Sequence, residues 1–496
     1  MLLSLLLLIP FSGALALSIW PGKQTSSRLR TGTIALLTIQ CVTSFTLLLL
    51  FDPTDPKSQL LEQARWVRSI GLDYALAVDG LSLPLIFMNG TLCLVAAVAS
   101  RFIENRPRIY FALLLVICGA VNGAFLSKNL LLFFLFYELE LIPLWLLIAV
   151  WGGANRFYAA TKFLIVTAVS GMLILGAFFG LALATGTMDF SLRPITSNEL
   201  NLTTQLLLMG ALLIGFGIKI PLFPFHTWLP DAHTEASTPV SVLLAGVLLK
   251  LGAYGLLRFC LGLFPEAWQV AAPWLAVWAA ISILYGSLAA IAQTDMKRMV
   301  AYSSVGHMGY VLLAAAAATP LGLMGALFQM VSHGLISGVL FLLVGTVYAR
   351  TGTRDLTVLR GLLNPERGLP LTGSLMIIGV MASAGIPGMA GFISEFLIFR
   401  GSLQPFPVAT LLSMIGSGLT AVYFLLLVNR AFFGRLAIAP GEISNPRILD
   451  RVALYEQIPA IALSLGILTL GLVPALLSNL SEATTTGLSQ LNGGLS

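Results

Sequence analysis

Charged residues are scarce in this chain. They make up 10% of its 496 residues, whereas soluble domains carry about 25%. Hydrophobic residues make up 57%. These proportions exclude an ordinary soluble domain and indicate an integral membrane protein.

Motifs that bind metals or nucleotides are also missing from the sequence. The four cysteines lie at positions 41, 93, 118 and 260, with no CxxC pair and no metal-ligand spacing. Neither GxGxxG nor GxxxxGK[ST] occurs. We therefore expect no cofactor, metal or nucleotide to be bound by this chain, and we interpret the cysteines as small apolar residues.

Long apolar runs, by contrast, are abundant. A helix needs about 20 apolar residues to cross a hydrocarbon core of about 30 Å. Fourteen such runs predict an all-α polytopic membrane protein with about 14 transmembrane helices. They lie near residues 2–20, 31–51, 81–102, 110–127, 129–151, 159–185, 202–228, 239–262, 270–292, 299–318, 320–349, 371–399, 405–432 and 455–478.

The basic residues are distributed unevenly between the two sets of connections. When basic residues at the ends of spans are counted with the adjoining connection, seventeen of the 27 lysines and arginines lie in connections after odd-numbered spans, seven after even-numbered spans and three within spans. By the positive-inside rule, the odd connections face the cytoplasm or its equivalent and both termini face the opposite side. Because these residues orient the helices, the net charge of +6 does not imply a nucleic acid partner.

One stretch, residues 215–259, places two lysines inside apolar segments: GFGIKIPLFPFHTWLPDAHTEASTPVSVLLAGVLLKLGAYGLLRF. An ionised lysine at the bilayer centre costs about 2.5–3.5 kcal/mol, so Lys219 and Lys250 should face a protein interior. Pro221 and Pro224 should break the seventh helix just after Lys219. A broken helix at membrane depth is buried in protein or lines a water-filled cavity. The stretch therefore predicts part of an ion pathway.

A second break is expected in helix 12, where ASAGIPGMAGFISEF places glycines and Pro387 in mid-span. Pro387 follows Pro221 by 166 residues, and a similar offset relates helix 4 to helix 9 and helix 8 to helix 13. Matching broken helices indicate a repeated transporter core. Because five helices form each copy, helices 4–8 and 9–13 should be an inverted repeat. We divide the chain into three N-terminal transmembrane helices (1–109), a first repeat (110–262), a second repeat (263–433) and a C-terminal helix and tail (434–496).

Acidic residues also occur within the predicted spans, namely Glu138 and Glu140 in helix 5 and Glu395 in helix 12. One interpretation is that they form salt bridges that hold helices together. We favour a transport role for Glu138, Lys219 and Lys250, because the charged set extends over both repeats and includes positions at helix breaks. Glu138 and Glu140 lie about 200° apart around a helix, so they cannot face the same axis. The role of Glu140 is left open.

All four histidines lie in or beside the predicted spans. His333 and His307 are candidate proton relays because the unperturbed pKa of histidine is near 6.5. The alternative is that each is a hydrogen-bonded core residue. His226, Asp231 and His233 follow the helix 7 break, where they resemble a metal motif only weakly and could equally cap helix ends.

Three segments resemble the antiporter-like subunits of complex I and of multisubunit cation/proton antiporters. They read KIPLFPFHTWLPDAHTEASTPVSVLLAGVLLKLGAYGLLRF, TDMKRMVAYSSVGHMGYVLL and YELELIPLWLLIAVWGG. The similarity covers essentially the whole chain. Fourteen helices, and an acid at Glu395 where other branches usually carry lysine, resemble the subunit 4 branch, the NuoM/NdhD family.

The resemblance implies a role for each matching residue. Glu138 matches the family's helix 5 glutamate, Lys219 and Lys250 match its helix 7 and helix 8 lysines, and Glu395 matches its terminal helix 12 acid. Attraction to Glu138 would favour the charged form of Lys219, and separation would release a proton toward Lys250. Glu395 would then exchange the proton with one side of the membrane or with a neighbouring subunit.

The resemblance also implies the setting of this relay. The implied complex is a thylakoid NAD(P)H or ferredoxin:plastoquinone oxidoreductase (NDH-1) of a cyanobacterium or plastid. In that complex this chain would be a proton-translocating membrane subunit. Neighbouring antiporter-like subunits and membrane lipid are the expected partners, and plastoquinone and iron–sulfur clusters are expected in partner subunits. The helix 12 wording and the short N-terminus favour a form of the complex specialised for CO2 uptake. The alternative is a subunit of a sodium/proton antiporter.

Overall fold

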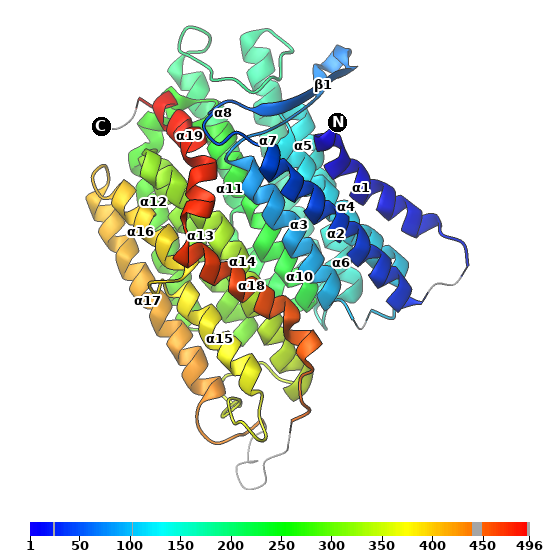
Figure 1. Cartoon of the computed structure of the whole chain (residues 1–496). Coiled ribbons are helices and arrows are strands. Elements are labelled where there is room, and N and C mark those ends of the chain that lie inside the picture. Colours follow the sequence, from blue (N-terminus) through cyan, green and yellow to red (C-terminus); the bar gives the residue numbers. More distant parts are fainter. Residues whose placement is uncertain (23–24, 102, 439–448, 494–496) are drawn as a thin grey trace.

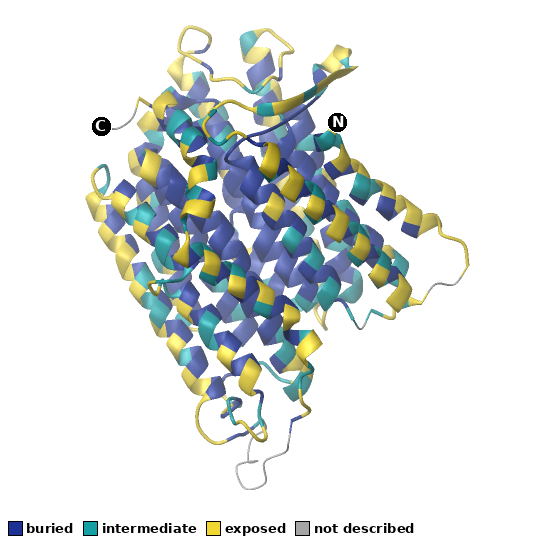
Figure 2. Cartoon of the chain, viewed as in Figure 1, coloured by how far each residue is buried: buried dark blue, intermediate teal, exposed yellow. Residues whose placement is uncertain are grey.

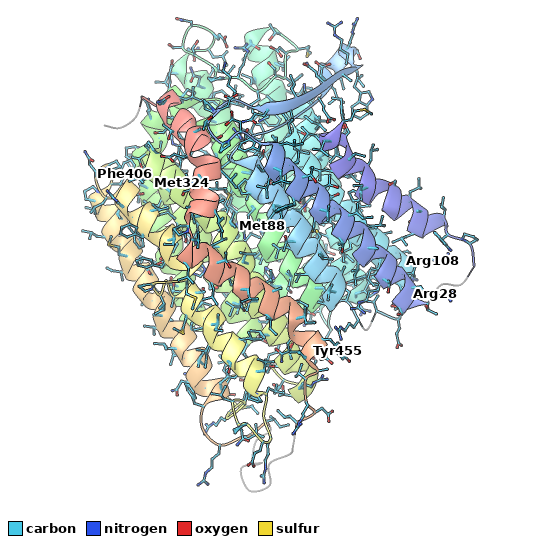
Figure 3. The ribbon with its side chains drawn as sticks, in the orientation of Figure 1. Arg28, Met88, Arg108, Met324, Phe406 and Tyr455 are labelled. Atoms are coloured by element: carbon cyan, nitrogen blue, oxygen red, sulfur yellow. The ribbon has the colours of Figure 1, made fainter. Side chains whose placement is uncertain are left out.

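The helices run between two opposite ends of the molecule and enclose a buried centre (Figures 1 and 2). The computed structural model describes residues 1–496 except 23–24, 102, 439–448 and 494–496. Strand β1 (Gln59–Val67), the start of α1 (Leu2–Ile19) and the end of α19 (Ala475–Leu491) lie toward the upper end in Figure 1. Arg28 and Arg108, near two of the odd connections, lie at the right-hand side of Figure 3, around mid-height. The termini are therefore on the same side of the bundle, as the sequence predicts.

The described elements are nineteen α-helices, two strands and four short helical segments of other types. The α-helices are α1 (Leu2–Ile19), α2 (Ser26–Leu50), α3 (Ser82–Ala99), α4 (Pro107–Leu126), α5 (Leu130–Leu139), α6 (Leu141–Trp151), α7 (Arg156–Thr185), α8 (Leu202–Lys219), α9 (Trp228–Glu235), α10 (Thr238–Leu243), α11 (Leu249–Gly255), α12 (Pro265–Ile291), α13 (Met296–Ala317), α14 (Pro320–Thr351), α15 (Pro370–Ser383), α16 (Ala390–Ser402), α17 (Pro407–Phe432), α18 (Leu454–Leu472) and α19 (Ala475–Leu491). The others are strands β1 (Gln59–Val67) and β2 (Leu72–Val78), 3-10 turns η1 (Arg68–Ile70) and η2 (Phe225–Thr227), and π-helical segments η3 (Leu244–Leu248) and η4 (Leu256–Leu261).

Thirteen spans within the described residues are long and apolar enough to cross a membrane. The one predicted span that is not among these thirteen is helix 12 (residues 371–399). It is divided between α15 and α16, and each part is too short to cross the membrane alone. The spans differ in burial: α14 and the span from α10 to η4 are enclosed by other helices, whereas α2, α7 and α17 expose apolar side chains (Figure 2). Exposed leucines and phenylalanines on outer helices are expected where lipid is the solvent.

The predicted break in helix 7 is present. Helix α8 ends at Lys219, and Pro221 and Pro224 follow it in a segment that is not α-helical. The chain becomes helical again in α9 from Trp228, whose indole Nε1 donates a hydrogen bond of 2.9 Å to the carbonyl of Ile218. The break therefore satisfies one of the carbonyls left free at the end of α8.

The predicted break in helix 12 is also present, but its chemistry differs. Helix α15 ends at Ser383 and α16 begins at Ala390. Between them Gly385 and Gly388 have φ values of +69° and +90°, a region that side chains rarely enter. A Cβ at position 385 would lie 2.7 Å from Oε2 of Glu395. Glycine thus allows the bend and leaves space for the Glu395 carboxylate. The inverted relation of the two repeats and the boundaries between them stay predictions.

Two parts of the chain differ from the predictions. The two strands differ from the predicted all-α fold, and a helix is present where we predicted a C-terminal tail. Strands β1 and β2 form an antiparallel hairpin with Gly71 at φ +69° in its turn, between two predicted spans of a chain that we expected to be all-α. The residues after Leu472 form helix α19, which packs on α14. Ser481 and Ser489 of α19 donate hydrogen bonds of 2.6 and 2.7 Å to the carbonyls of Gly80 and Ala318. Hydropathy missed both elements because neither is a continuous apolar run.

Candidate functional site

Lys219, the last residue of α8, is buried against α5. Its Nζ lies 2.7 Å from Oε1 of Glu140 and donates a hydrogen bond of 3.1 Å to the carbonyl of Tyr137. The same nitrogen lies 3.3 Å from the centre of the Tyr137 ring, which attracts a cation. The side chains of Lys219 and Glu140 are 2% and 0% exposed. The lysine charge is therefore compensated inside the protein, as its membrane depth requires.

The residue that forms an ion pair with Lys219 is Glu140, whose role the sequence left open, and not the predicted Glu138. Helix 5 is interrupted at Glu140, between α5 and α6, and Pro143 lacks the amide hydrogen that would bond the carbonyl of Leu139. Glu138 lies on another side of the helix, partly exposed and packed against Gly171 of α7. Among the described residues no lysine or arginine lies within 4.0 Å of Glu138. Its role in transport stays a prediction.

Lys250 lies in α11, between the two π-helical segments, and is fully buried. Its Nζ donates a hydrogen bond of 2.6 Å to the carbonyl of Ala245 and lies 2.7 Å from Nδ1 of His333. No carboxylate is among the ion-pair partners of Lys250 in the described part of the chain. A lysine and an imidazole at this distance must share a hydrogen, because one nitrogen has to donate and the other accept. The pair is therefore a place where one proton can move.

His333 of α14 faces His307 of α13 across a small cavity. Their ring centres are 5.5 Å apart, and Nε2 of each ring has no hydrogen-bond partner in the described part of the chain. The cavity has a volume of about 10 Å³ for the centre of a water molecule, which is close to the minimum for one water. Its lining includes His307, Gln329, Ser332, His333, Ser383 and Glu395.

Glu395 of α16 closes the far side of this cavity. Its Oε2 accepts a hydrogen bond of 2.6 Å from Ser417 of α17, and no cation of the described residues lies within 4.0 Å. The neighbouring Ser394 donates to Oε1 of Gln329 at 2.6 Å. The structure thus brings the predicted residues Lys250, His333, His307 and Glu395 together around one polar interior.

Lys219 and Glu140 form a separate pair beside that interior. Helix α11, which carries Lys250, packs on α8 at Gly252, where a Cβ would lie 3.2 Å from Cβ of Lys219. The absence of a side chain at Gly252 therefore lets the two lysine-bearing helices approach closely. Of the six predicted residues, four surround the polar interior, Lys219 pairs with Glu140, and Glu138 forms no ion pair among the described residues.

Sequence reasoning missed a second buried ion cluster. Asp79, between β2 and α3, pairs with Lys128 at 2.7 Å and with Arg258 of η4. Although burial raises the pKa of Asp79, Arg258 and Lys128 outweigh it and hold that pKa below its usual range. Lys128 and Arg258 are two of the basic residues counted in connections after even-numbered spans, so the sequence does not predict this cluster. The one available signal for the cluster was Arg258 itself, a basic residue eight positions after Lys250 on a buried helix. The cluster joins α3 and the start of α5 to the end of the helix 8 span.

The residues after the helix 7 break do not form a metal site. Asp231 pairs with Lys162 at 2.7 Å and with Arg298 at 3.8 Å. His233 stacks on Phe341 with ring centres 4.5 Å apart, and His226 packs beside Tyr285. Among the described residues no group of three or more potential ligands could hold a metal ion. Asp231 links α9 to α7 and α13 through these ion pairs.

Comparisons with known proteins place the chain in a family. Residues 127–424 match the family described as NADH:quinone oxidoreductase/Mrp antiporter, TM. A NAD(P)H-quinone oxidoreductase chain 4 of Synechococcus sp. (strain JA-3-3Ab) is 45% identical over 90% of this chain and 85% of its own length. A chain of respiratory complex I from Thermus thermophilus is 28% identical with a TM-score of 0.88, covering 100% of both chains. A chain of the Mrp complex from Dietzia sp. DQ12-45-1b has a TM-score of 0.84 at 23% identity, over 100% of this chain and 99% of that one. The chain belongs to the family of NADH:quinone oxidoreductase and Mrp antiporter transmembrane subunits.

Proposed function

We propose that this chain is the proton-translocating membrane subunit 4 of an NAD(P)H:quinone oxidoreductase of the NDH-1 type. The observation that carries the proposal is the buried polar interior between the two helix breaks, with Lys250 and His333 in contact at 2.7 Å. The cyanobacterial relative at 45% identity supports the subunit and a thylakoid location. The specialised CO2-uptake form of the complex stays a prediction.

The pathway begins with the Glu140–Lys219 ion pair. While the carboxylate is 2.7 Å from Nζ, it stabilises the ammonium form of Lys219. If a conformational change separates the pair, the buried ammonium loses its counter-charge and can release a proton. The broken helix next to Lys219 is the element that can move without disrupting a continuous hydrogen-bond ladder.

The second part of the pathway carries the proton toward Glu395. Lys250 passes a proton to Nδ1 of His333. The Nε2 atoms of His333 and His307, which have no hydrogen-bond partner among the described residues, can then donate or accept the proton in the next step. One water in the small cavity would connect the imidazoles with the Glu395 carboxylate. Glu395 then exchanges the proton with one side of the membrane or with a neighbouring antiporter-like subunit.

Electron transfer belongs to other subunits in this proposal. We infer that plastoquinone and iron–sulfur clusters are held by partner chains, because this sequence carries no cysteine motif for a cluster. The contribution of this chain is to change the proton affinity of buried groups when its neighbours move. Membrane lipid and the neighbouring membrane subunits are its direct partners.

A sodium/proton antiporter subunit is the alternative function. The Mrp chain has the same fold, but its 23% identity supports the fold alone. The two functions differ in cation dependence. Quinone-linked proton uptake without sodium supports the proposal, whereas sodium-dependent transport without quinone reduction supports the alternative.

The test is proton uptake per electron in liposomes that contain the purified intact complex. Lys250→Met should lower this ratio, because methionine has a similar length but cannot carry a proton. Lys57→Met, at an exposed lysine of a connection, is the matched control. An assembled Lys250→Met complex with the wild-type ratio would show that the buried interior is not the pathway.

A further inference from the structure

Two adjoining hollows occupy one face of the helical bundle, away from the polar interior. The first, here called the basic cavity, has a volume of about 240 Å³ and lies between the end of α3, the start of α10, α14 and α18. The second, the apolar groove, has a volume of about 650 Å³ and lies between α3, α14, α18 and α19. Met88 in the groove and Tyr455 beside the basic cavity mark this face in Figure 3.

The two hollows follow one another along the same helices. On α18, Ala460 lines the basic cavity, and Ala462 and Leu463 line the groove. On α3 the combined lining runs from Pro84 to Ala99, a distance of about 22 Å at 1.5 Å per residue. This length is enough for a polar head group plus a hydrocarbon chain that crosses one leaflet of about 15 Å.

The basic cavity carries more positive than negative charge. Glu456 in its lining is matched by Arg350 at 2.8 Å. Arg101 has no carboxylate within 4.0 Å among the described residues, and its guanidinium binds the carbonyl of Tyr455 at 2.7 Å and stacks over that ring. Arg30 adds a second charge at the end of α3, where it binds the carbonyls of Ala97 and Val98. The cavity therefore suits an anion.

Three buried polar atoms in the lining of the basic cavity have no hydrogen-bond partner among the residues that the structure describes. They are Oγ of Ser237, Nε of Arg350 and Oε1 of Gln457. Gln457 is 2% exposed, and its amide nitrogen is already used in a bond of 2.7 Å to Thr372. Buried polar groups without partners are costly. The hydroxyl and the guanidinium can donate to acid oxygens, and the amide oxygen can accept from a hydroxyl.

We propose that the basic cavity and the apolar groove together bind one anionic glycerophospholipid with a hydroxylated head group, of the phosphatidylglycerol type. The phosphate lies at Arg101, Ser237 and Arg350, and a head-group hydroxyl donates to Gln457. One acyl chain fills the groove, whose lining is apolar except for Thr91, Thr469 and Asn479. A neutral apolar occupant would leave Arg101 without a counter-charge and the three polar atoms without hydrogen-bond partners. The predicted cytoplasmic position of this end favours anionic lipid as well.

The site is tested by counting the lipids retained by the intact complex purified in mild detergent. Lipid extraction and mass spectrometry should find phosphatidylglycerol bound to the wild type. Arg101→Gln should lower its retention about five-fold, because one arginine near a membrane surface contributes about that much. Gly466→Phe should displace the acyl chain, because a Cβ at position 466 meets only Leu335, at 3.6 Å, and a larger side chain must enter the groove.

Matched controls separate this site from general effects on the membrane surface. Arg68→Gln removes an exposed arginine from the opposite end, and Gly176→Phe adds a phenylalanine to an exposed face of α7. Both should retain the wild-type amount of lipid. The proposal is overturned if Arg101→Gln and Gly466→Phe also retain it, if sulfolipid or neutral galactolipid is the lipid lost, or if a cryo-EM map shows a partner helix in the groove. None of these readouts depends on proton pumping, so the proposed function is judged separately.

Discussion

The two broken helices hold their ionisable residues in different ways. At the helix 7 break, proline interrupts the chain and Lys219 has a carboxylate at 2.7 Å and an aromatic ring below it. At the helix 12 break, Gly385 and Gly388 turn the chain beside Pro387, and the one hydrogen bond of the Glu395 carboxylate among the described residues is from the Ser417 hydroxyl at 2.6 Å. A buried pair can remain charged, whereas a lone buried acid is less costly when neutral. The first break is therefore suited to a switch that opens and closes, and the second to a single group that gains and loses a proton.

The most damaging change should be Lys219→Met, which removes the charge from the first break. Proton translocation should fall on the order of 10²-fold, the usual contribution of a group that transfers protons. Quinone reduction coupled to it should fall as well, because the relay cannot cycle. The measurement is proton uptake together with redox rate in liposomes with the assembled complex, using Lys57→Met as the control.

If an assembled Lys219→Met complex pumps fully, Lys219 serves only to hold α8 against α5. Assembly is checked first, since the change leaves Glu140 without its cation. Breaking a buried pair in this way typically costs about 3–5 kcal/mol. Addition of Glu140→Gln should then recover assembly but not pumping.

The next comparison concerns the two helix 5 glutamates. Glu140→Gln should reduce proton uptake more than Glu138→Gln, because Glu140 is the carboxylate in contact with Lys219. Glutamine keeps the volume and loses the charge, so packing is nearly preserved. A larger loss in Glu138→Gln would mean that the lysine changes partner during the cycle, or that Glu138 acts at the surface shared with a neighbouring subunit.

The second break is tested at Glu395 with two replacements. Glu395→Gln should stop transfer through this subunit, and Glu395→Lys should keep part of it, because glutamine cannot titrate and lysine can. Proton uptake per electron is measured for both after equal assembly is confirmed. Wild-type uptake in the glutamine variant would place the exit elsewhere, with His333 the next candidate.

The smallest effect on transport is expected at Asp79, whose ion cluster belongs to neither break. Its pKa is held below the usual range, so the stability that it contributes is present above its unfolded pKa of about 3.9 and is lost as pH falls through its folded pKa. Asp79→Asn should therefore destabilise the chain at neutral pH, by about 3–5 kcal/mol for a broken buried pair. Thermal unfolding of the purified complex measures this, with exposed Asp52→Asn as the control.

Asp79→Asn should leave the protons taken up per electron unchanged in the molecules that remain folded. A lower ratio at normal stability would contradict the structural role and would add the Asp79 cluster to the pathway. In that case proton transfer would no longer be confined to the ionisable residues at and between the two helix breaks.

The sequence by itself determined the membrane class, the approximate positions of the thirteen spans found in the described residues, and both helix breaks. These features depend on local chemistry: a hydrocarbon core demands long apolar runs, and Pro221, Gly385 and Gly388 act on the backbone where they stand. Burial of Lys219, Lys250 and Glu395 also followed, because charges at membrane depth are excluded from lipid.

Tertiary structure decided which of these groups meet. Glu138 and Glu140 are equivalent by composition, and only the interruption at Glu140 and the packing of α8 select Glu140 as the partner of Lys219. Arg258, Lys128 and Asp79 are far apart in the chain and form one cluster only when three helices come together. Contacts of this kind depend on how helices are rotated against one another, and hydropathy along a single chain does not contain that rotation.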